Sequence, residues 1–138
     1  MSYEQGDAER TIDAGKAPLR LRLAKGPLAG PVLGRVVSMV LTRADWPVDR
    51  LHEAMLVCDA LSAHAPAHAY DGHVTFSVER QGEQVRLSVE DLAAGGAEAI
   101  VGEAELPGVG NVLERIPERI AAEPDDGGSR LVLVLSRG

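Results

Sequence analysis

The first regular pattern along the chain is an alternation with a period of two. Leu19, Leu21 and Leu23 alternate with Arg20 and Arg22. In a β-strand successive side chains point to opposite faces, so this run predicts a strand with one buried face.

From residue 28 the apolar spacing lengthens to three and four, which is the spacing of one buried helical face. It predicts two consecutive helices over residues 28–44 and 48–65. Trp46-Pro47 separates them, and Pro66 ends the second because proline cannot continue the helical hydrogen bonding. Two alternating runs follow over 74–78 and 85–89. They predict a hairpin, joined by a turn of three-residue type at Gln81-Gly82-Glu83.

The regular spacing is lost over residues 91–107, which we expect to form a long loop, and loops of that length are often functional. A helical spacing returns over 109–120, where Pro117 is expected to kink or split the helix. A tight turn over 125–128 leads into an apolar strand at 131–135.

The predicted order is therefore strand, helix, helix, strand, strand, loop, helix and strand. Two consecutive helices followed by a hairpin do not fit a doubly wound parallel sheet. The outer positions of the hairpin are polar, so one face of the sheet should remain uncovered. We predict an α+β fold: a two-layer α/β sandwich with a mixed, mostly antiparallel sheet and helices on one face.

The length of 138 residues predicts one domain, over residues 18–138. Residues 1–17 are polar and acidic, so we expect a flexible tail and not a signal peptide. With no long apolar run to span a membrane, a cytoplasmic protein is expected.

The chain carries 14 Lys and Arg against 21 Asp and Glu, a net charge of −7. This balance argues against a nucleic-acid partner, which requires clustered basic charge. A single cysteine excludes an internal disulfide framework, and Cys58 itself is expected to be a small core residue. His64 and His68 have the spacing of a helical metal pair, but Pro66 between them breaks the helix.

The succession of elements resembles the GHKL ATPase superfamily with its Bergerat-type ATP-binding fold, and within it the small bacterial anti-sigma-factor serine kinases. The resemblance covers residues 19–136. It rests on the opening Leu19-Arg-Leu-Arg-Leu strand, the turn at Trp46 between the helices and the Gly127-Gly128 hairpin before the last strand.

In that family the second helix carries a general-base Glu and, four residues later, an Asn that helps to hold magnesium. The resemblance implies that Asp59 stands at the base position and that Ala63 replaces the Asn. A methyl group cannot ligate magnesium, which demands oxygen ligands, so no metal ligand is expected there.

The resemblance further implies that Asp91, at a strand end, reads the adenine amino group. Gly108 and Gly110 would hold phosphate at a helix start. Ala93 and Asn111 depart from the family pattern. Each motif also has a plainer interpretation: Asp59 on a solvated helix face, Asp91 satisfying turn amides, and the two glycines shaping a loop.

Three functions follow from the resemblance. The preferred one is a protein-binding regulator of the anti-sigma-factor type, switching between a sigma factor and a STAS-domain antagonist, with a decayed nucleotide site. The alternatives are an active serine-protein kinase that uses ATP and magnesium, and an ATP-binding switch without phosphotransfer. A homodimer that pairs through the first strand region is also implied.

Overall fold

The structure is a computed structural model that describes residues 18–138, so the predicted tail of residues 1–17 lies outside the described residues. The elements in chain order are β1 (Leu19–Ala24), α2 (Ala29–Arg43), α3 (Val48–His64), the 3-10 helix η1 (Ala65–His68), β2 (His73–Gln81), β3 (Gln84–Leu92), α4 (Gly96–Glu103), β4 (Glu105–Leu106), β5 (Gly110–Asn111), α5 (Val112–Arg115), β6 (Arg119–Asp125) and β7 (Gly128–Ser136).

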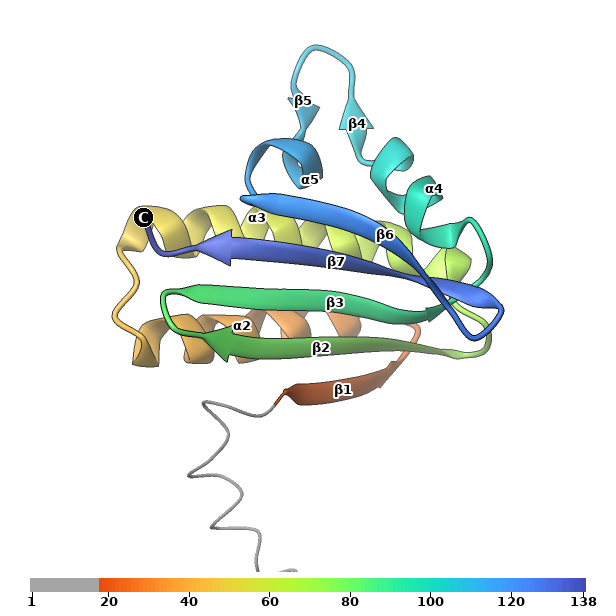
Figure 1. The fold of residues 1–138 in the computed structure, drawn as a ribbon, viewed down its shortest axis with the longest axis horizontal. Helices are drawn as coiled ribbons and strands as arrows, with labels where there is room; N and C mark the ends of the chain where they lie inside the picture. Colours follow the sequence, from red (N-terminus) through yellow and green to blue (C-terminus); the bar gives the residue numbers. More distant parts are fainter. Residues whose placement is uncertain (1–17) are drawn as a thin grey trace, which may run out of the picture.

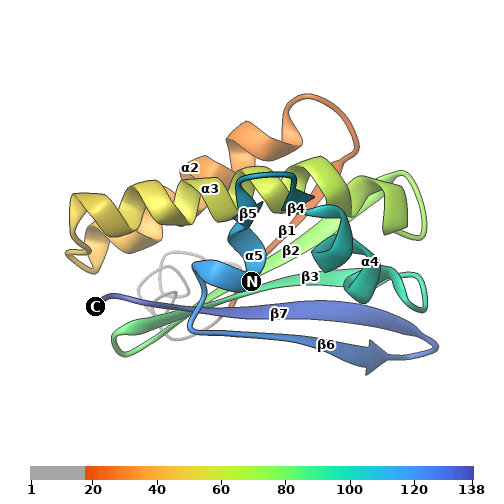
Figure 2. The same ribbon diagram turned by 90° about the horizontal axis from the view of Figure 1, so that it is seen from above.

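Five strands form one sheet in the order β1-β2-β3-β7-β6, and each neighbouring pair is antiparallel. The helices all lie on one side of this sheet, so the molecule has two layers (Figure 1 and Figure 2). The predicted two-layer α+β fold is therefore confirmed, and its five-stranded sheet is antiparallel throughout.

The hydrophobic core lies between the two layers. Alternate positions of β2, β3 and β7 point toward the helices, because residues i and i+2 of a strand share a face. Phe76 is fully buried and pairs with Leu21 on one side and Val89 on the other. On the helical side the core is completed by one buried stripe from each long helix, which includes Leu33 and Leu61. No helix within residues 18–138 is long and apolar enough to cross a membrane.

The prediction of a loop over residues 91–107 is wrong in its middle, which forms α4. Left-handed Gly95 (φ 79°) is the N-cap residue that precedes this helix. Ala97, Ile100 and Ala104 are buried at helical spacing. The buried face is narrow and made mostly of small residues. The alanine- and glycine-rich sequence therefore shows no clear helical spacing of large apolar residues.

The predicted helix over 109–120 is also wrong. Only the four residues of α5 are helical, and β6 begins at Arg119. The apolar spacing that suggested a helix continues across Pro117, which cannot sit within one. Residues after it pair with β7 instead, with Ile120 opposite Leu133. β6 is an edge strand, which explains why it tolerates Pro124.

Both predicted hairpins are present. The β2–β3 turn has two residues, Gly82-Glu83, where three were predicted, because Gln81 and Gln84 still pair. The β6–β7 turn is at Asp126-Gly127, where both residues have positive φ angles of 47° and 83°. This is the backbone of a type I′ turn, which Asp-Gly favours.

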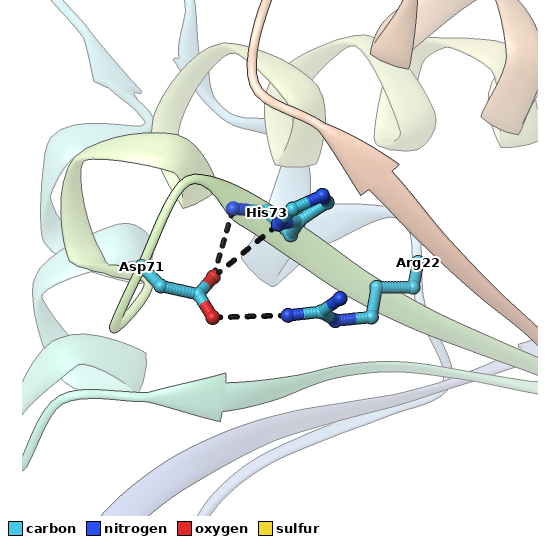
Figure 3. A network of polar contacts seen from close by, with 3 residues as sticks. All are labelled: Arg22, Asp71 and His73. Atoms are coloured by element: carbon cyan, nitrogen blue, oxygen red, sulfur yellow. Dashed lines mark hydrogen bonds and ion pairs between the residues drawn. The ribbon is translucent and has the colours of Figure 1, made fainter.

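A small polar network fixes the edge strand β1 to the turn before β2 (Figure 3). One Asp71 oxygen accepts a 2.9 Å hydrogen bond from the His73 backbone N–H. The other oxygen lies 3.0 Å from the Arg22 guanidinium. The backbone hydrogen bond from His73 is the largest effect on the pKa of Asp71, and it holds that pKa below its ordinary value of 3.8. Desolvation opposes this lowering, while the charges of Arg22 and His73 and the hydrogen bond from Arg22 add to it.

Asp71→Asn is expected to lower the melting temperature slightly at neutral pH, because asparagine can still accept the His73 hydrogen bond but has no charge. A lowered carboxyl pKa stabilises the fold above the unfolded value and loses that effect as pH falls through the folded value. The difference between Asp71→Asn and the unsubstituted protein should therefore shrink below about pH 4. Melting curves at a series of pH values test this, and a difference independent of pH would contradict it.

Candidate functional site

Asp59 lies on the outer side of the helical layer, along a groove between α2 and α3. The groove has a volume of about 720 Å³. Its lining residues are Gly30, Pro31, Gly34, Arg35, Ser38, Met39, Thr42 and Arg43 from α2, and Met55 and Asp59 from α3. Ala63, one turn further along α3, is exposed.

The opposite side of α3 faces α4. His64 Nδ1 lies 3.7 Å from Glu103 Oε1, and His68 Nε2 lies 2.9 Å from Glu103 Oε2. Since five residues turn a helix by about 140°, Asp59 and His64 point to different sides of α3. Asp59 is therefore directed toward α2 and away from α4. The pairing of both histidines with one glutamate was not evident from the sequence, because Glu103 is 35 residues away from His68.

Asp91 occupies a β-bulge at the end of β3. The register with β7 shifts between Val89 and Leu92. This shift turns Leu92 into the core and leaves Asp91 exposed, with a positive φ of 57°. Aspartate tolerates this left-handed conformation better than most residues. Its carbonyl accepts a 3.3 Å hydrogen bond from the Tyr70 N–H.

Gly108 and Gly110 belong to the small β4–β5 hairpin, which projects away from the sheet in Figure 1. The turn runs Leu106-Pro107-Gly108-Val109, and the Val109 N–H donates to the Leu106 carbonyl at 3.0 Å. Proline followed by a glycine with φ of 77° is the pattern of a type II turn. Gly110 also has a positive φ, of 102°. The hairpin geometry alone thus requires both glycines.

The helix after the hairpin, α5, has only four residues, and its first turn is already capped. Asn111 Oδ1 accepts the Leu113 N–H at 3.0 Å, and Asn111 Nδ2 donates to the Val101 carbonyl at 2.7 Å. The Arg115 guanidinium, which sequence reasoning missed, donates to the Val109 carbonyl at 2.9 Å. A phosphate at this point would compete with these hydrogen bonds for its donors.

The space between α3 and the 91–116 segment is filled by core side chains. Ile100 of α4 and Leu113 of α5 are fully buried in the same cluster as Val57 and Leu61 of α3. Asp59 lines the groove between α2 and α3, and Asp91, Gly108 and Gly110 are not among the residues that line it. This groove therefore does not bring together the residues that the resemblance implies for ATP.

The donor set does not fit a magnesium–nucleotide either. Ala63 offers only a methyl group where an oxygen ligand is needed. Within the described part of the chain, no three or more His, Cys, Asp or Glu side chains are arranged to hold a metal ion.

Cys58 lies beside Asp59 but is turned into the core, as expected, and is almost fully buried. Burial, and secondarily the charge of Asp59, raises the pKa of its thiol from 9.0 to about 12.

We therefore predict that iodoacetamide leaves Cys58 unmodified in the folded protein at pH 8, because the thiolate is the reactive form. Unfolding in urea should expose the thiol and make it react like a free cysteine. The measurement is the mass of the protein after alkylation with and without urea, and rapid alkylation without urea would contradict the burial of Cys58.

Comparison with known proteins gives matches in structure but not in sequence. No protein-family model and no curated protein matches the chain. The structure of the RsbU and RsbW domains of Rv1364c from Mycobacterium tuberculosis matches with a TM-score of 0.58 and 16% identity, over 88% of this chain and 32% of that one. A chain of the SiaB–SiaC complex from Pseudomonas aeruginosa matches with a TM-score of 0.56 and 9% identity, over 98% of this chain and 99% of that one.

This chain shares their fold. At these sequence identities the likeness concerns the backbone and not the site residues. The chain spans about a third of the length of the Rv1364c chain. The fold expected from the resemblance to anti-sigma-factor kinases agrees with both matches.

Proposed function

We propose that this chain is a protein-binding regulator of the anti-sigma-factor type whose nucleotide site has decayed. It would act in the cytoplasm by partner switching, binding either a sigma factor or a STAS-domain antagonist. The proposal is supported by the places of the candidate residues in the fold: Asp59 lies in the groove between α2 and α3, Asp91 at the β3 bulge, and Gly108 and Gly110 in the β4–β5 hairpin.

Two findings support a protein as the ligand. One structural match is a chain that was solved in a two-protein complex, and the other includes an RsbW domain. The sheet face opposite the helices carries the charged side chains of Glu79, Arg86 and Glu90 around the buried hydroxyl groups of Ser77 and Ser88. The helical layer has exposed apolar residues. A protein-binding domain needs only such complementary surfaces.

Purified sigma factors and STAS-domain proteins from the source organism, titrated one at a time, test the proposal. We expect one of them to bind with the same affinity with and without ATP, and we expect Asp91→Asn to leave that affinity unchanged. Phosphate transfer from ATP to a STAS-domain protein would instead establish the kinase alternative. Binding that requires ATP but gives no transfer would establish the ATP-dependent switch.

A further inference from the structure

The outer face of the helical layer carries two exposed stripes that run side by side. The α2 stripe begins at the residue before the helix and consists of Leu28, Val32, Arg35, Met39 and Arg43, at steps of three and four residues. The α3 stripe consists of Asp49, His52, Leu56, Asp59 and Ala63, at the same steps. Leu28, Met39 and Leu56 are exposed by 73%, 49% and 50%. Apolar side chains at this spacing usually face another element.

The charges on the two stripes are opposite. The α2 stripe has Arg35 and Arg43, and α2 contains no acidic residue. The α3 stripe has Asp49 and Asp59. Within residues 18–138 neither Arg35 nor Arg43 forms an ion pair. Both arginines are exposed, so they can reach a partner that carries carboxylates.

The charges also match in height along the helices. A Cβ atom at Gly30 would lie 3.3 Å from Ser62 Cβ, which fixes the alignment of the two antiparallel helices. Counting from this pair, Arg43 is level with Asp49, and Arg35 is within about 3 Å of the level of Asp59. Each cation on α2 therefore has an anion at its own height on α3.

We infer that this face binds a second copy of the same chain. A two-fold axis parallel to the helices places α2 of one protomer over α3 of its partner at the same height. Every Arg35 then faces Asp59 of the partner subunit, every Arg43 faces Asp49 of the partner subunit, and the apolar residues between them meet. Such an interface is self-complementary and closed, as expected of a homodimer. The four helices form an antiparallel bundle across it.

The area of this face determines how tightly the two copies are expected to bind. Two helices of this length cover roughly 500 Å² on each protomer, which is at the lower end for a specific interface. The dimer should therefore be reversible, with a dissociation constant in the micromolar range. This interface differs from the pairing through β1 that the family resemblance implies. It goes beyond the proposed function, because it requires neither a sigma factor nor a nucleotide.

Sedimentation of the protein alone, over a range of concentrations, tests the inference with a charge exchange. Arg35→Glu and Asp59→Arg should each weaken the dimer roughly thirtyfold, since each creates two like-charge contacts across the two-fold axis. The double variant R35E/D59R restores opposite charges and should recover most of the lost affinity. Arg22→Glu on β1, where the arginine side chain is also exposed, is the control on a different face and should leave the dimer unchanged.

Three results would overturn the inference: a monomer at millimolar protein concentration, no recovery in the double variant, or loss of the dimer in Arg22→Glu. The last result would favour pairing through β1. Both exchanged residues are exposed, so circular dichroism should show that every variant is folded. Failure of this experiment leaves the proposed function intact, because the partner titration described above does not depend on self-association.

Discussion

Gly128→Ala is expected to lower the free energy of unfolding by about 3 kcal/mol or more, and the melting temperature by roughly 10 °C. A Cβ atom at this position would overlap the Leu92 carbonyl oxygen and the Tyr70 hydroxyl. The tyrosine side chain is exposed and can turn away. The carbonyl cannot move, because Leu92 pairs with Ser129 and its side chain is buried in the core. Urea denaturation followed by circular dichroism measures the loss.

Two further variants test why Gly128→Ala should lose stability. Tyr70→Ala added to Gly128→Ala should not restore stability if the backbone carbonyl is the obstacle. Gly102→Ala, at a helical position of α4 where a Cβ would meet nothing within 4 Å, should stabilise the protein by about 0.5–1 kcal/mol. A loss below about 1 kcal/mol in Gly128→Ala would mean that the β3–β7 register around the bulge is more adaptable than described.

Ile100→Ala is expected to cost about 3 kcal/mol, because it removes a fully buried side chain and leaves a cavity. This variant tests whether α4 is packed on the core, where the sequence predicted an open loop over residues 91–107. The N-terminus of α4 is held by Ser129 Oγ, which accepts the Ala97 N–H at 3.1 Å and donates to the Ala93 carbonyl at 2.7 Å.

The matched control is Glu98→Ala on the exposed side of the same helix, for which we expect a change within about 0.5 kcal/mol. Hydrogen exchange should show protection of the backbone N–H groups of Ile100 and Ala104, whose hydrogen bonds lie in or next to α4. If Ile100→Ala were as stable as the control, the segment would be a loop and the space beside α3 would be open to a ligand.

The first two-thirds of the fold could be predicted from the sequence because its elements have strong periods. The alternation of leucine with arginine in β1, and the spacing of Leu33, Val37 and Leu41 in α2, each correspond to one buried face. The segment between α4 and β6 could not be predicted because local spacing competed with tertiary pairing. Ile116 and Ile120 have a helical separation, yet Ile120 pairs with Leu133 on a strand. Only the neighbouring β7 decides between the two.

The sequence could suggest candidate site residues but not how they are arranged in space. The sequence identifies Asp59 on the second helix, but the direction of its side chain depends on where α2 and α4 pack against α3. Asp91 follows a strand, as expected, but the bulge that turns it outward depends on a register shift between β3 and β7. The role of Asn111 as the N-cap of α5 could have been predicted from the sequence, since asparagine before a helix commonly caps it.

Calorimetric titration with ATP, with and without magnesium, shows whether this protein-binding domain has a working nucleotide site. We expect no binding heat at millimolar nucleotide in either condition, because the core side chains of α4 and α5 fill the space beside α3 and Ala63 offers no ligand to magnesium. Micromolar binding that Asp91→Asn abolishes would contradict it.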